Sequence, residues 1–342
     1  MTNMSNSTDD YGQEPLVQAK NLVKYFKVPR KGWLHAVDNI SFSVYPGETL
    51  GIVGESGCGK STVGNVVMRL HDKTGGSLLY RGKDVFTEWT DKLELCKKMQ
   101  IIFQDPYSSL NPRKTIENTL SEAYVIHKYG SKSEIAKAVR ENCDTVELPH
   151  SLLNRYPHEL DGGMRQVVGI ARALSLNPDF IVCDEPVSSL DVSVQARIIN
   201  LLMDLQKKLK ISYLFISHDL SVVRHISNRI VIMYLGQIME TAETDQIFAN
   251  ALHPYSIALL SAIPRVNETA AASRIVLKGD VPSPMNPTPG CRFAPRCWMA
   301  HDDCASTDQE LIEAEPGHFV YCKYAAESRQ RSEAETASST VS

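Results

Sequence analysis

The stretch GESGCGKST at residues 54–62 decides the fold, because it contains the pattern G-x-x-x-x-G-K-[ST] of a phosphate-binding loop. Its glycines let successive backbone N–H groups turn inward around phosphate oxygens, and the helix expected after the loop adds its positive N-terminus. Lys60 is expected to neutralise the β- and γ-phosphates of a nucleotide, and the Ser61 hydroxyl to ligate Mg²⁺. The residues predicted to surround the phosphates are Gly54, Glu55, Ser56, Gly57, Cys58, Gly59, Lys60, Ser61 and Thr62.

Around this loop, short apolar runs alternate with amphipathic segments from Leu16 to about residue 250. Residues 192–209 carry apolar side chains at helical spacing on one face. The runs typical of buried strands are ETLGIVGES (48–56), DFIVCDEP (179–186), SYLFISHD (212–219) and RIVIMYLG (229–236). This alternation predicts an α/β fold in which helices cover a parallel sheet.

Polar side chains follow the ends of several predicted strands. Asp184 ends one of them and is expected to hold Mg²⁺ through water, while the adjacent Glu185 accepts a proton from the attacking water or orients it. His218 ends another strand at the same carboxyl edge, within reach of a γ-phosphate. Gln104 stands where a strand gives way to a helix-rich segment and is expected to sense Mg²⁺ or water. Together these residues indicate nucleotide hydrolysis.

The composition is that of an ordinary globular protein. The chain has 342 residues, of which 43% are hydrophobic and 22% charged, and its formal net charge is −4 at pH 7. A nucleic-acid partner is not expected, because proteins that bind nucleic acids usually carry a basic excess. The N-terminus MTNMSNSTDD lacks the apolar core of a signal peptide, and no apolar run reaches the ~18–20 residues of a membrane span. We therefore expect a cytosolic chain that reaches a membrane only through partners.

Changes in amino-acid composition along the chain suggest its domain boundaries. Polar, featureless sequence at both ends predicts disordered tails, and the proline-rich run VPSPMNPTPG (281–290) predicts an extended connector. We expect residues 1–14 to form a disordered tail, 15–250 a nucleotide-binding domain with a helical insertion at about 106–165, 251–325 a C-terminal extension, and 326–342 a second disordered tail.

Four cysteines, Cys291, Cys297, Cys304 and Cys322, fall within 32 positions of that extension. In a reducing compartment such a cluster indicates metal binding rather than disulfides. Four thiolates suit either Zn²⁺ or a [4Fe–4S] cluster, although the tight C-x2-C pairs typical of structural zinc are missing.

The motifs resemble those of the ATPase subunits of ABC transporters over nearly the whole chain. The matching segments are 54–61 with the Walker A loop, 181–185 with Walker B, Gln104 with the Q-loop, 188–191 with the D-loop and His218 with the H-loop. The resemblance implies a RecA-like core, an antiparallel β subdomain, and ATP with Mg²⁺ as ligands. It also implies an aromatic that stacks on adenine, for which we predict Phe26, with Tyr25 or a plain core residue as alternatives.

The stretch ELDGGMRQ (159–166) stands where that family carries its signature loop, usually LSGGQ. The resemblance implies that this loop touches ATP held by a partner ATPase, through the backbone of Gly162 and Gly163. Asp161 replaces the signature serine, and an ionised carboxylate cannot donate a hydrogen bond to phosphate. Either Asp161 turns outward as a tolerated variant, or the two ATP sites are unequal and the partner ATPase is a non-identical chain.

The segment LHPYSIALLSAIP (252–264) and the cysteine spacing narrow the resemblance to oligopeptide, dipeptide and nickel importers. This resemblance favours a [4Fe–4S] cluster over zinc. It implies an ATP-hydrolysing subunit that powers peptide import from the cytoplasmic face of the membrane. Its expected partners are a second ATPase, two permease subunits and, indirectly, a solute-binding protein. The helical insertion is expected to grip the permeases, with Gln104 as the hinge. Alternatives are import of nickel or other small solutes, a carbon–phosphorus lyase complex, or a scaffold that binds ATP without turning it over.

Overall fold

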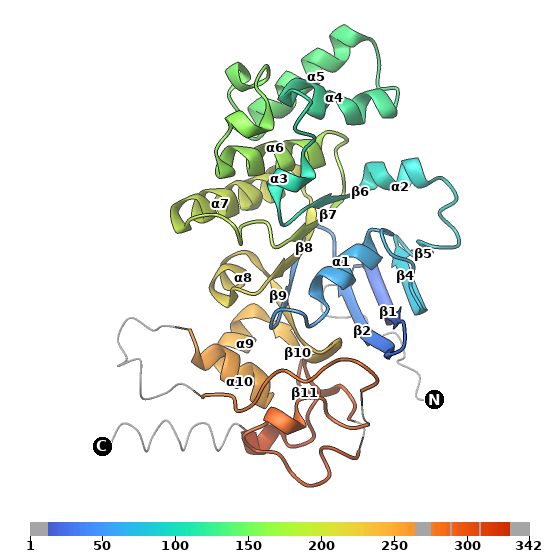
Figure 1. The fold of residues 1–342 in the computed structure, drawn as a ribbon, viewed down its shortest axis with the longest axis vertical. Coiled ribbons are helices and arrows are strands. Elements are labelled where there is room, and N and C mark those ends of the chain that lie inside the picture. The colour runs from blue at the N-terminus through green and yellow to red at the C-terminus, as the bar shows by residue number, and fades with distance from the viewer. Residues whose placement is uncertain (1–12, 264–274, 288, 308, 329–342) are drawn as a thin grey trace.

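The computed structural model describes residues 13–263, 275–287, 289–307 and 309–328, and within them the chain forms two sheets (Figure 1). The smaller sheet is antiparallel, with strand order β2-β1-β4-β5. Its strands are β1 (Val17–Val28), β2 (Gly32–Val44), β4 (Gly75–Tyr80) and β5 (Lys83–Asp84). The predicted antiparallel β subdomain is therefore present.

The larger sheet has the order β11-β12-β10-β9-β3-β8-β7-β6, and its strands from β9 to β6 run parallel. These parallel strands are β3 (Thr49–Val53), β6 (Met99–Ile102), β7 (Phe180–Asp184), β8 (Ser212–Ser217) and β9 (Arg229–Tyr234). The four apolar runs predicted as strands form β3, β7, β8 and β9, and residues 192–209 form helix α7 (Val192–Leu209). The predicted parallel core is confirmed.

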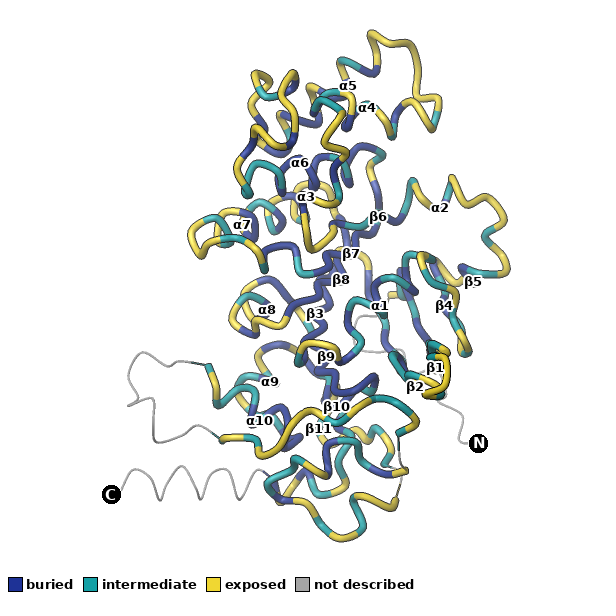
Figure 2. Tube along the Cα trace, in the orientation of Figure 1, coloured by how far each residue is buried: buried dark blue, intermediate teal, exposed yellow. Residues whose placement is uncertain are grey.

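Figure 2 shows that the parallel strands are largely buried. Both of their faces are covered, and their side chains alternate between two cores. In β7, Ile181 and Cys183 enter the core beneath α6 (Gly162–Leu174), α7 and α8 (Leu220–Ile226). Phe180 and Val182 enter the other core, with α1 (Lys60–Val67) and the smaller sheet. Burial on both faces explains why these strands read as continuous apolar runs.

Between β6 and β7 the described chain is helical and contains no strand. The helices are α3 (Pro106–Ser109), α4 (Ile116–Ile126), α5 (Lys132–Thr145) and α6, with short 3-10 turns at His150–Leu152 and Pro157–Glu159. Local capping fixes their starts. Ser131 and Glu134 form a reciprocal capping box at α5, and Thr115 caps α4. A further helix, α2 (Lys92–Lys98), precedes β6.

The C-terminal segment continues the larger sheet. After β10 (Gln237–Glu243) come α9 (Thr244–Asn250), α10 (Pro254–Ser261), a 3-10 turn at Ala294–Arg296, β11 (Ile312–Glu315) and β12 (His318–Val320). β12 pairs with β10, which the sequence did not predict. Glu240 of β10 is fully buried and accepts hydrogen bonds from the backbone N–H groups of Leu252 (2.7 Å) and His253 (2.9 Å). Its carboxylate also lies 2.7 Å from Nε2 of His318 in β12.

The remaining expectations concern the connector and the ends. The proline-rich connector lies along β2, where the His35 N–H donates to the Pro284 carbonyl (3.1 Å). The predicted tails at 1–14 and 326–342 fall almost wholly outside the described residues; of the parts that are described, 13–14 have no helix or strand and 326–328 are helical. No helix in the described ranges has the length and apolar character needed to cross a bilayer.

Candidate nucleotide-binding site

The glycine-rich loop joins β3 to α1, as the motif requires. Gly59 precedes α1 with φ of 107°, and a Cβ there would lie 2.0 Å from the Ala36 carbonyl oxygen, so only glycine fits. Lys60 is buried, and its Nζ donates to the carbonyls of Gly54 (2.8 Å) and Glu55 (3.1 Å). The lysine is therefore held at the mouth of the loop, where phosphates would approach.

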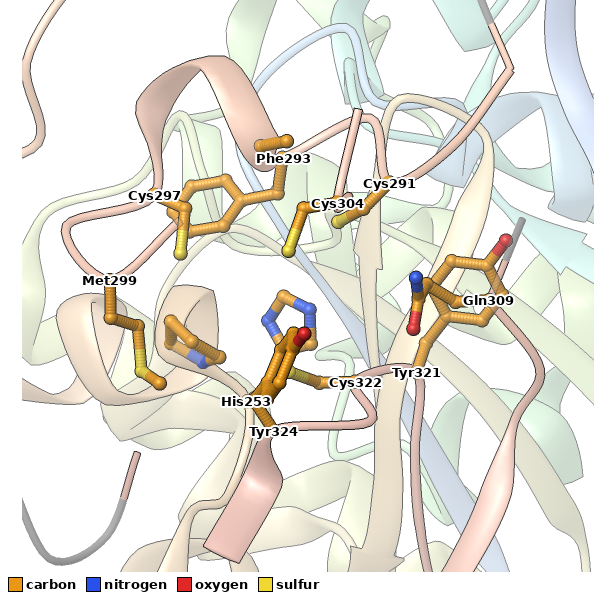
Figure 3. Close-up of a pocket in the computed structure, with 12 residues that line it drawn as sticks. His253, Cys291, Phe293, Cys297, Met299, Cys304, Gln309, Tyr321, Cys322 and Tyr324 are labelled. Carbon is orange, nitrogen blue, oxygen red and sulfur yellow. The ribbon is translucent and has the colours of Figure 1, made fainter. Parts of the chain in front are cut away.

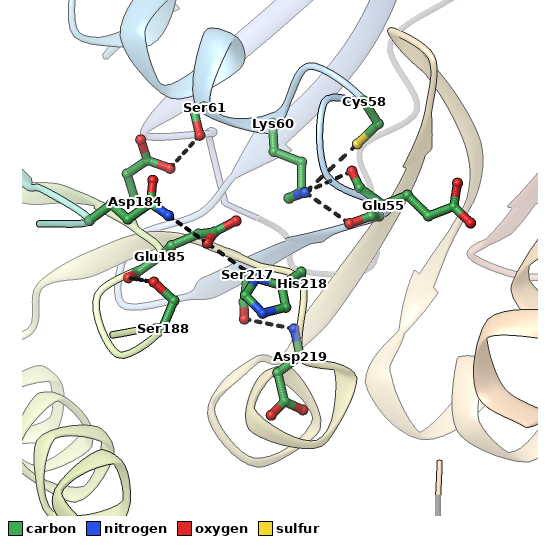
Figure 4. A network of polar contacts seen from close by, with 12 residues as sticks. Glu55, Cys58, Lys60, Ser61, Asp184, Glu185, Ser188, Ser217, His218 and Asp219 are labelled. Carbon is green, nitrogen blue, oxygen red and sulfur yellow. Dashed lines mark hydrogen bonds and ion pairs between the residues drawn. The ribbon is translucent and has the colours of Figure 1, made fainter. Parts of the chain in front are cut away.

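Three residues were predicted for the magnesium site, and two of them, Ser61 and Asp184, meet at the sheet edge (Figure 4), whereas Gln104 contacts Glu185 instead. The Ser61 hydroxyl donates to Oδ1 of Asp184 at 2.8 Å, although the residues stand 123 positions apart. Burial raises the pKa of Asp184, and the nearby Glu185 charge adds to this, while the Ser61 hydrogen bond and Lys60 act against it. A hydroxyl and a carboxylate at this distance form an oxygen donor pair of the kind that Mg²⁺ prefers.

Glu185 is the centre of a second group of contacts (Figure 4). Its Oε2 accepts from Nε2 of Gln104 (3.0 Å) and lies 3.1 Å from Nδ1 of His218. These side chains follow β7, β6 and β8, so the parallel sheet brings all three to one edge. Glu185 adopts a positive φ of 45°, a left-handed conformation that it shares with eleven other non-glycine residues of the described chain. The structure thus brings together the three predicted catalytic residues.

The predicted adenine-stacking residue lies in β1. The Tyr25 ring already stacks on His35 with ring centroids 3.8 Å apart, and its hydroxyl donates to Asp38. Phe26 is half-buried and makes an edge contact with His71 at 5.4 Å. Of the two aromatics, Phe26 is the one that is not stacked on another ring in the described structure, and the Lys24 ammonium lies 4.7 Å from its ring centroid.

Asp161 has a structural role that sequence reasoning missed. It is the N-cap of α6, and its Oδ1 accepts from the Met164 N–H at 2.7 Å. Aspartate is a favoured N-cap residue, which was the available signal. Gly163 is also explained by packing, because a Cβ there would lie 2.7 Å from Cγ1 of Val194 in α7. Asp161 and the two glycines that follow it, with residues 189–191, line a surface hollow of about 360 Å³.

The four clustered cysteines line one small cavity (Figure 3). Phe293, Met299 and Tyr324 also line it. Burial raises the pKa of Cys297 to about 11 and that of Cys322 to about 12, so both are thiols at neutral pH in this state. Within the described ranges, no three His, Cys, Asp or Glu side chains are grouped closely enough to hold a metal ion. This geometry therefore supports neither the predicted [4Fe–4S] cluster nor the zinc alternative.

Two residues from the C-terminal segment contact the phosphate loop, and neither was predicted. The Arg296 guanidinium donates to both carboxylate oxygens of Glu55, at 2.7 and 3.2 Å. The hydroxyl of Tyr255, in α10, accepts from the Glu55 N–H at 3.0 Å. No local pattern marks these residues, since their partner lies about 200 or more positions away in the chain.

Comparison with known proteins places this site in a family. Residues 37–188 match the ABC transporter family, and residues 239–304 match the oligopeptide/dipeptide transporter C-terminal region. A putative peptide import ATP-binding protein of Brucella ovis is 49% identical over 91% of this chain and 98% of that protein. The oligopeptide transport ATP-binding protein AppF of Bacillus subtilis is 48% identical over 91% and 97%. The dipeptide transport ATP-binding protein DppF of Haemophilus influenzae is 46% identical over 90% and 96%.

Solved structures agree on the fold. The ATP-binding cassette MJ0796, in a dimeric post-hydrolysis state with ADP and Pi, is 29% identical and superposes with a TM-score of 0.60 over 67% of this chain and 98% of that chain. CbiO1 of Clostridium perfringens, part of an ABC transporter complex, is 25% identical with a TM-score of 0.62 over 69% and 92%. Fold and site together define an ATPase of the ABC type. The chain belongs to the ATP-binding proteins of the oligopeptide and dipeptide ABC transporters.

Proposed function

We propose that this chain hydrolyses ATP to power the import of peptides through a membrane ABC transporter. The observation that carries the proposal is the meeting of Ser61, Asp184 and Glu185 at one edge of the parallel sheet. The relatives named above as peptide, oligopeptide and dipeptide transport proteins supply the substrate class.

Each residue of the site has its own role in binding ATP and Mg²⁺. Lys60 would exchange the carbonyls of Gly54 and Glu55 for the β- and γ-phosphates of ATP. Ser61 and Asp184 would hold Mg²⁺, which when bound neutralises charge on those phosphates. The residue assigned to stack on adenine is Phe26.

Glu185 would orient the attacking water and accept its proton. Gln104 and His218 both contact the same Glu185 oxygen, so they can set the direction of that carboxylate. As ATP arrives, His218 could transfer its contact to the γ-phosphate and Gln104 could move toward Mg²⁺. Either exchange would link the nucleotide to the helices after β6.

The partners follow from the same assignment. We assign α3 to α5 as the helical insertion that docks on two permease subunits at the cytoplasmic face of the membrane, with a solute-binding protein acting through them. Large apolar side chains more than half exposed support this docking surface: Tyr107 (55%), Val125 (60%), Ile126 (53%) and Tyr129 (57%).

A second ATPase subunit would complete each ATP site, and we propose that it is a non-identical chain. Asp161 is exposed at the N-terminus of α6, where a signature loop would face the partner's phosphate. Its carboxylate would weaken the partner's site in any dimer, and a homodimer would carry that weakness twice. If the partner has an intact signature loop, the ATP site formed by that loop and this chain's phosphate loop would be fully active.

For the cysteine cavity we propose a [4Fe–4S] cluster. Four thiols line one cavity, which is the donor set such a cluster needs. Binding would require the thiols to lose their protons.

The test is peptide uptake by cells that carry the chain with its permeases and binding protein, in wild-type and Lys60→Ala forms. Peptide uptake that depends on Lys60 is the expected result. Uptake of nickel but no peptide would contradict the substrate class, and assembly with phosphonate-cleaving subunits instead of permeases would favour the lyase alternative.

A further inference from the structure

The cysteine segment and the phosphate loop touch each other through Glu55, the second residue of the loop motif. The Glu55 backbone carbonyl receives Lys60 at 3.1 Å, and its N–H is bound by the Tyr255 hydroxyl. Its carboxylate is bound by both outer nitrogens of Arg296. Every polar group of Glu55 is thereby assigned to a partner, and two of these partners come from the C-terminal segment.

The Arg296–Glu55 ion pair is largely shielded from solvent. The Arg296 side chain is 9% exposed and the Glu55 side chain 25% exposed. Solvent therefore screens this bidentate pair less than it screens exposed ion pairs. Without Arg296, the Glu55 carboxylate would stand uncompensated next to the place where ATP phosphates bind. Because like charges repel, removal of Arg296 would mainly lower the affinity for nucleotide.

Arg296 does not line the cysteine cavity, but it belongs to the short turn that lies beside it. It stands between Ala294 and Cys297, which both line the cavity, and it ends the short 3-10 turn there. Phe293 in the same turn packs against Tyr255, with ring centroids 5.2 Å apart (Figure 3 shows Phe293 beside Cys297). A shift of this turn would move Arg296 and Tyr255 together.

A second arginine fixes the same segment to the core. Arg292, directly after Cys291, donates to Asp38 in β2 and to the Leu235 carbonyl after β9. Arg292 and Arg296 therefore attach this segment to the nucleotide domain at two points. A movement of the cysteines beside them would change the position of both contacts.

We propose that Arg296 is a positioning residue for the phosphate loop, and that through it the state of the four-cysteine cavity sets the affinity for nucleotide. When the cysteines are fixed around the cavity, the turn at Ala294–Arg296 is fixed as well, and Arg296 stays bound to Glu55. Glu55 then keeps the phosphate loop that carries Lys60 in position. This inference rests on the nucleotide site proposed above.

The first test is the dissociation constant of Mg²⁺-ATP for the full chain, measured by titration calorimetry at low temperature. Arg296→Gln should weaken binding about tenfold, the scale of one lost charge-assisted contact. Tyr255→Phe, which keeps the ring packing, should weaken it by a smaller factor. The matched control is Arg81→Gln, which breaks the more exposed Arg81–Asp179 pair away from the loop and should bind as the wild type does.

The decisive variant is Arg296→Gln combined with Glu55→Gln. If the loss arises from an uncompensated carboxylate, the double variant should bind ATP more tightly than Arg296→Gln alone. A general loss of folding would give no such rescue. Wild-type affinity in Arg296→Gln, or additive losses in the double variant, would overturn the proposal. If the wild-type chain itself bound no nucleotide, the proposed function would fail first, which separates the two outcomes.

The link to the cavity is tested with Cys297→Ser in both backgrounds. It should weaken nucleotide binding in the wild-type background and have much less effect in the Arg296→Gln/Glu55→Gln background. Unchanged affinity in the first background, or equal losses in both, would show that the cavity does not act through Arg296.

Discussion

At the scale of single residues, Asp161 has a structural role and also stands at a position that bears on ATP binding. It caps α6 through the Met164 N–H, and it occupies the position where the family signature has serine. Serine also caps helices well, so the cap alone does not require a carboxylate. The difference between the two residues lies in charge and in the ability to donate a hydrogen bond.

Substitutions at Asp161 should separate these roles. Asp161→Ala should destabilise the chain by about 1 kcal/mol through loss of the cap, whereas Asp161→Ser should keep the stability close to wild type. In the complete transporter, Asp161→Ser should raise ATP turnover, because the partner's site gains a donor in place of a repelling charge. Thermal unfolding and ATP hydrolysis measure the two effects. Unchanged turnover would mean that Asp161 is a tolerated cap with no influence on the partner's site.

The sequence predicted Ser61 because it belongs to the phosphate-loop motif, and Asp184, Glu185 and His218 because each belongs to a short motif at a strand end. Spacing alone could not show that Gln104 and His218 meet on one Glu185 oxygen. Arg296 escaped prediction altogether, because its value depends on Glu55, 241 positions away. Contacts of that kind arise from tertiary packing and leave no local pattern.

At the scale of elements, β3, β7, β8, β9 and α7 were predictable because burial imposes continuous or periodic apolar sequence on them. β11 and β12 carry no such signal. β11 reads IEAE and is largely exposed, and β12 has three residues. Their position is fixed by pairing with β10 and by the buried Glu240, which are long-range features.

Glu240 should accordingly anchor the C-terminal segment. Glu240→Ala would leave two backbone N–H groups and His318 without their acceptor, and should cost about 3–5 kcal/mol, as removal of one partner of a buried pair does. Glu240→Gln keeps a carbonyl acceptor and should lose less. Denaturant unfolding of the full chain measures both, and a Glu240→Ala variant as stable as wild type would contradict this role.

At the scale of the whole molecule, the C-terminal segment joins the nucleotide domain through β12, Glu240 and Arg296. It therefore packs against the ATPase core through contacts that the sequence did not predict. The proposed cluster would sit inside this connection.

The cluster assignment predicts a measurable metal content. Chain purified without oxygen should contain about four iron and four sulfide per chain and absorb visible light, by the stoichiometry of a [4Fe–4S] cluster. Cys304→Ser should lower the iron content sharply, whereas Cys96→Ser, an exposed cysteine outside the cavity, should leave it unchanged. Zinc in place of iron, or iron that persists in Cys304→Ser, would contradict the assignment.

The central claim is that Glu185, held by Gln104 and His218 beside the Ser61–Asp184 pair, drives ATP hydrolysis for transport. The most direct measurement is ATP turnover by the assembled transporter with the peptide-loaded binding protein, comparing wild type with Glu185→Gln. The substitution keeps the shape of the side chain but removes the base, so turnover at this chain's site should fall by at least ~100-fold while Mg²⁺-ATP still binds. Turnover that is unchanged in Glu185→Gln, with the partner's own site inactivated, would contradict the account.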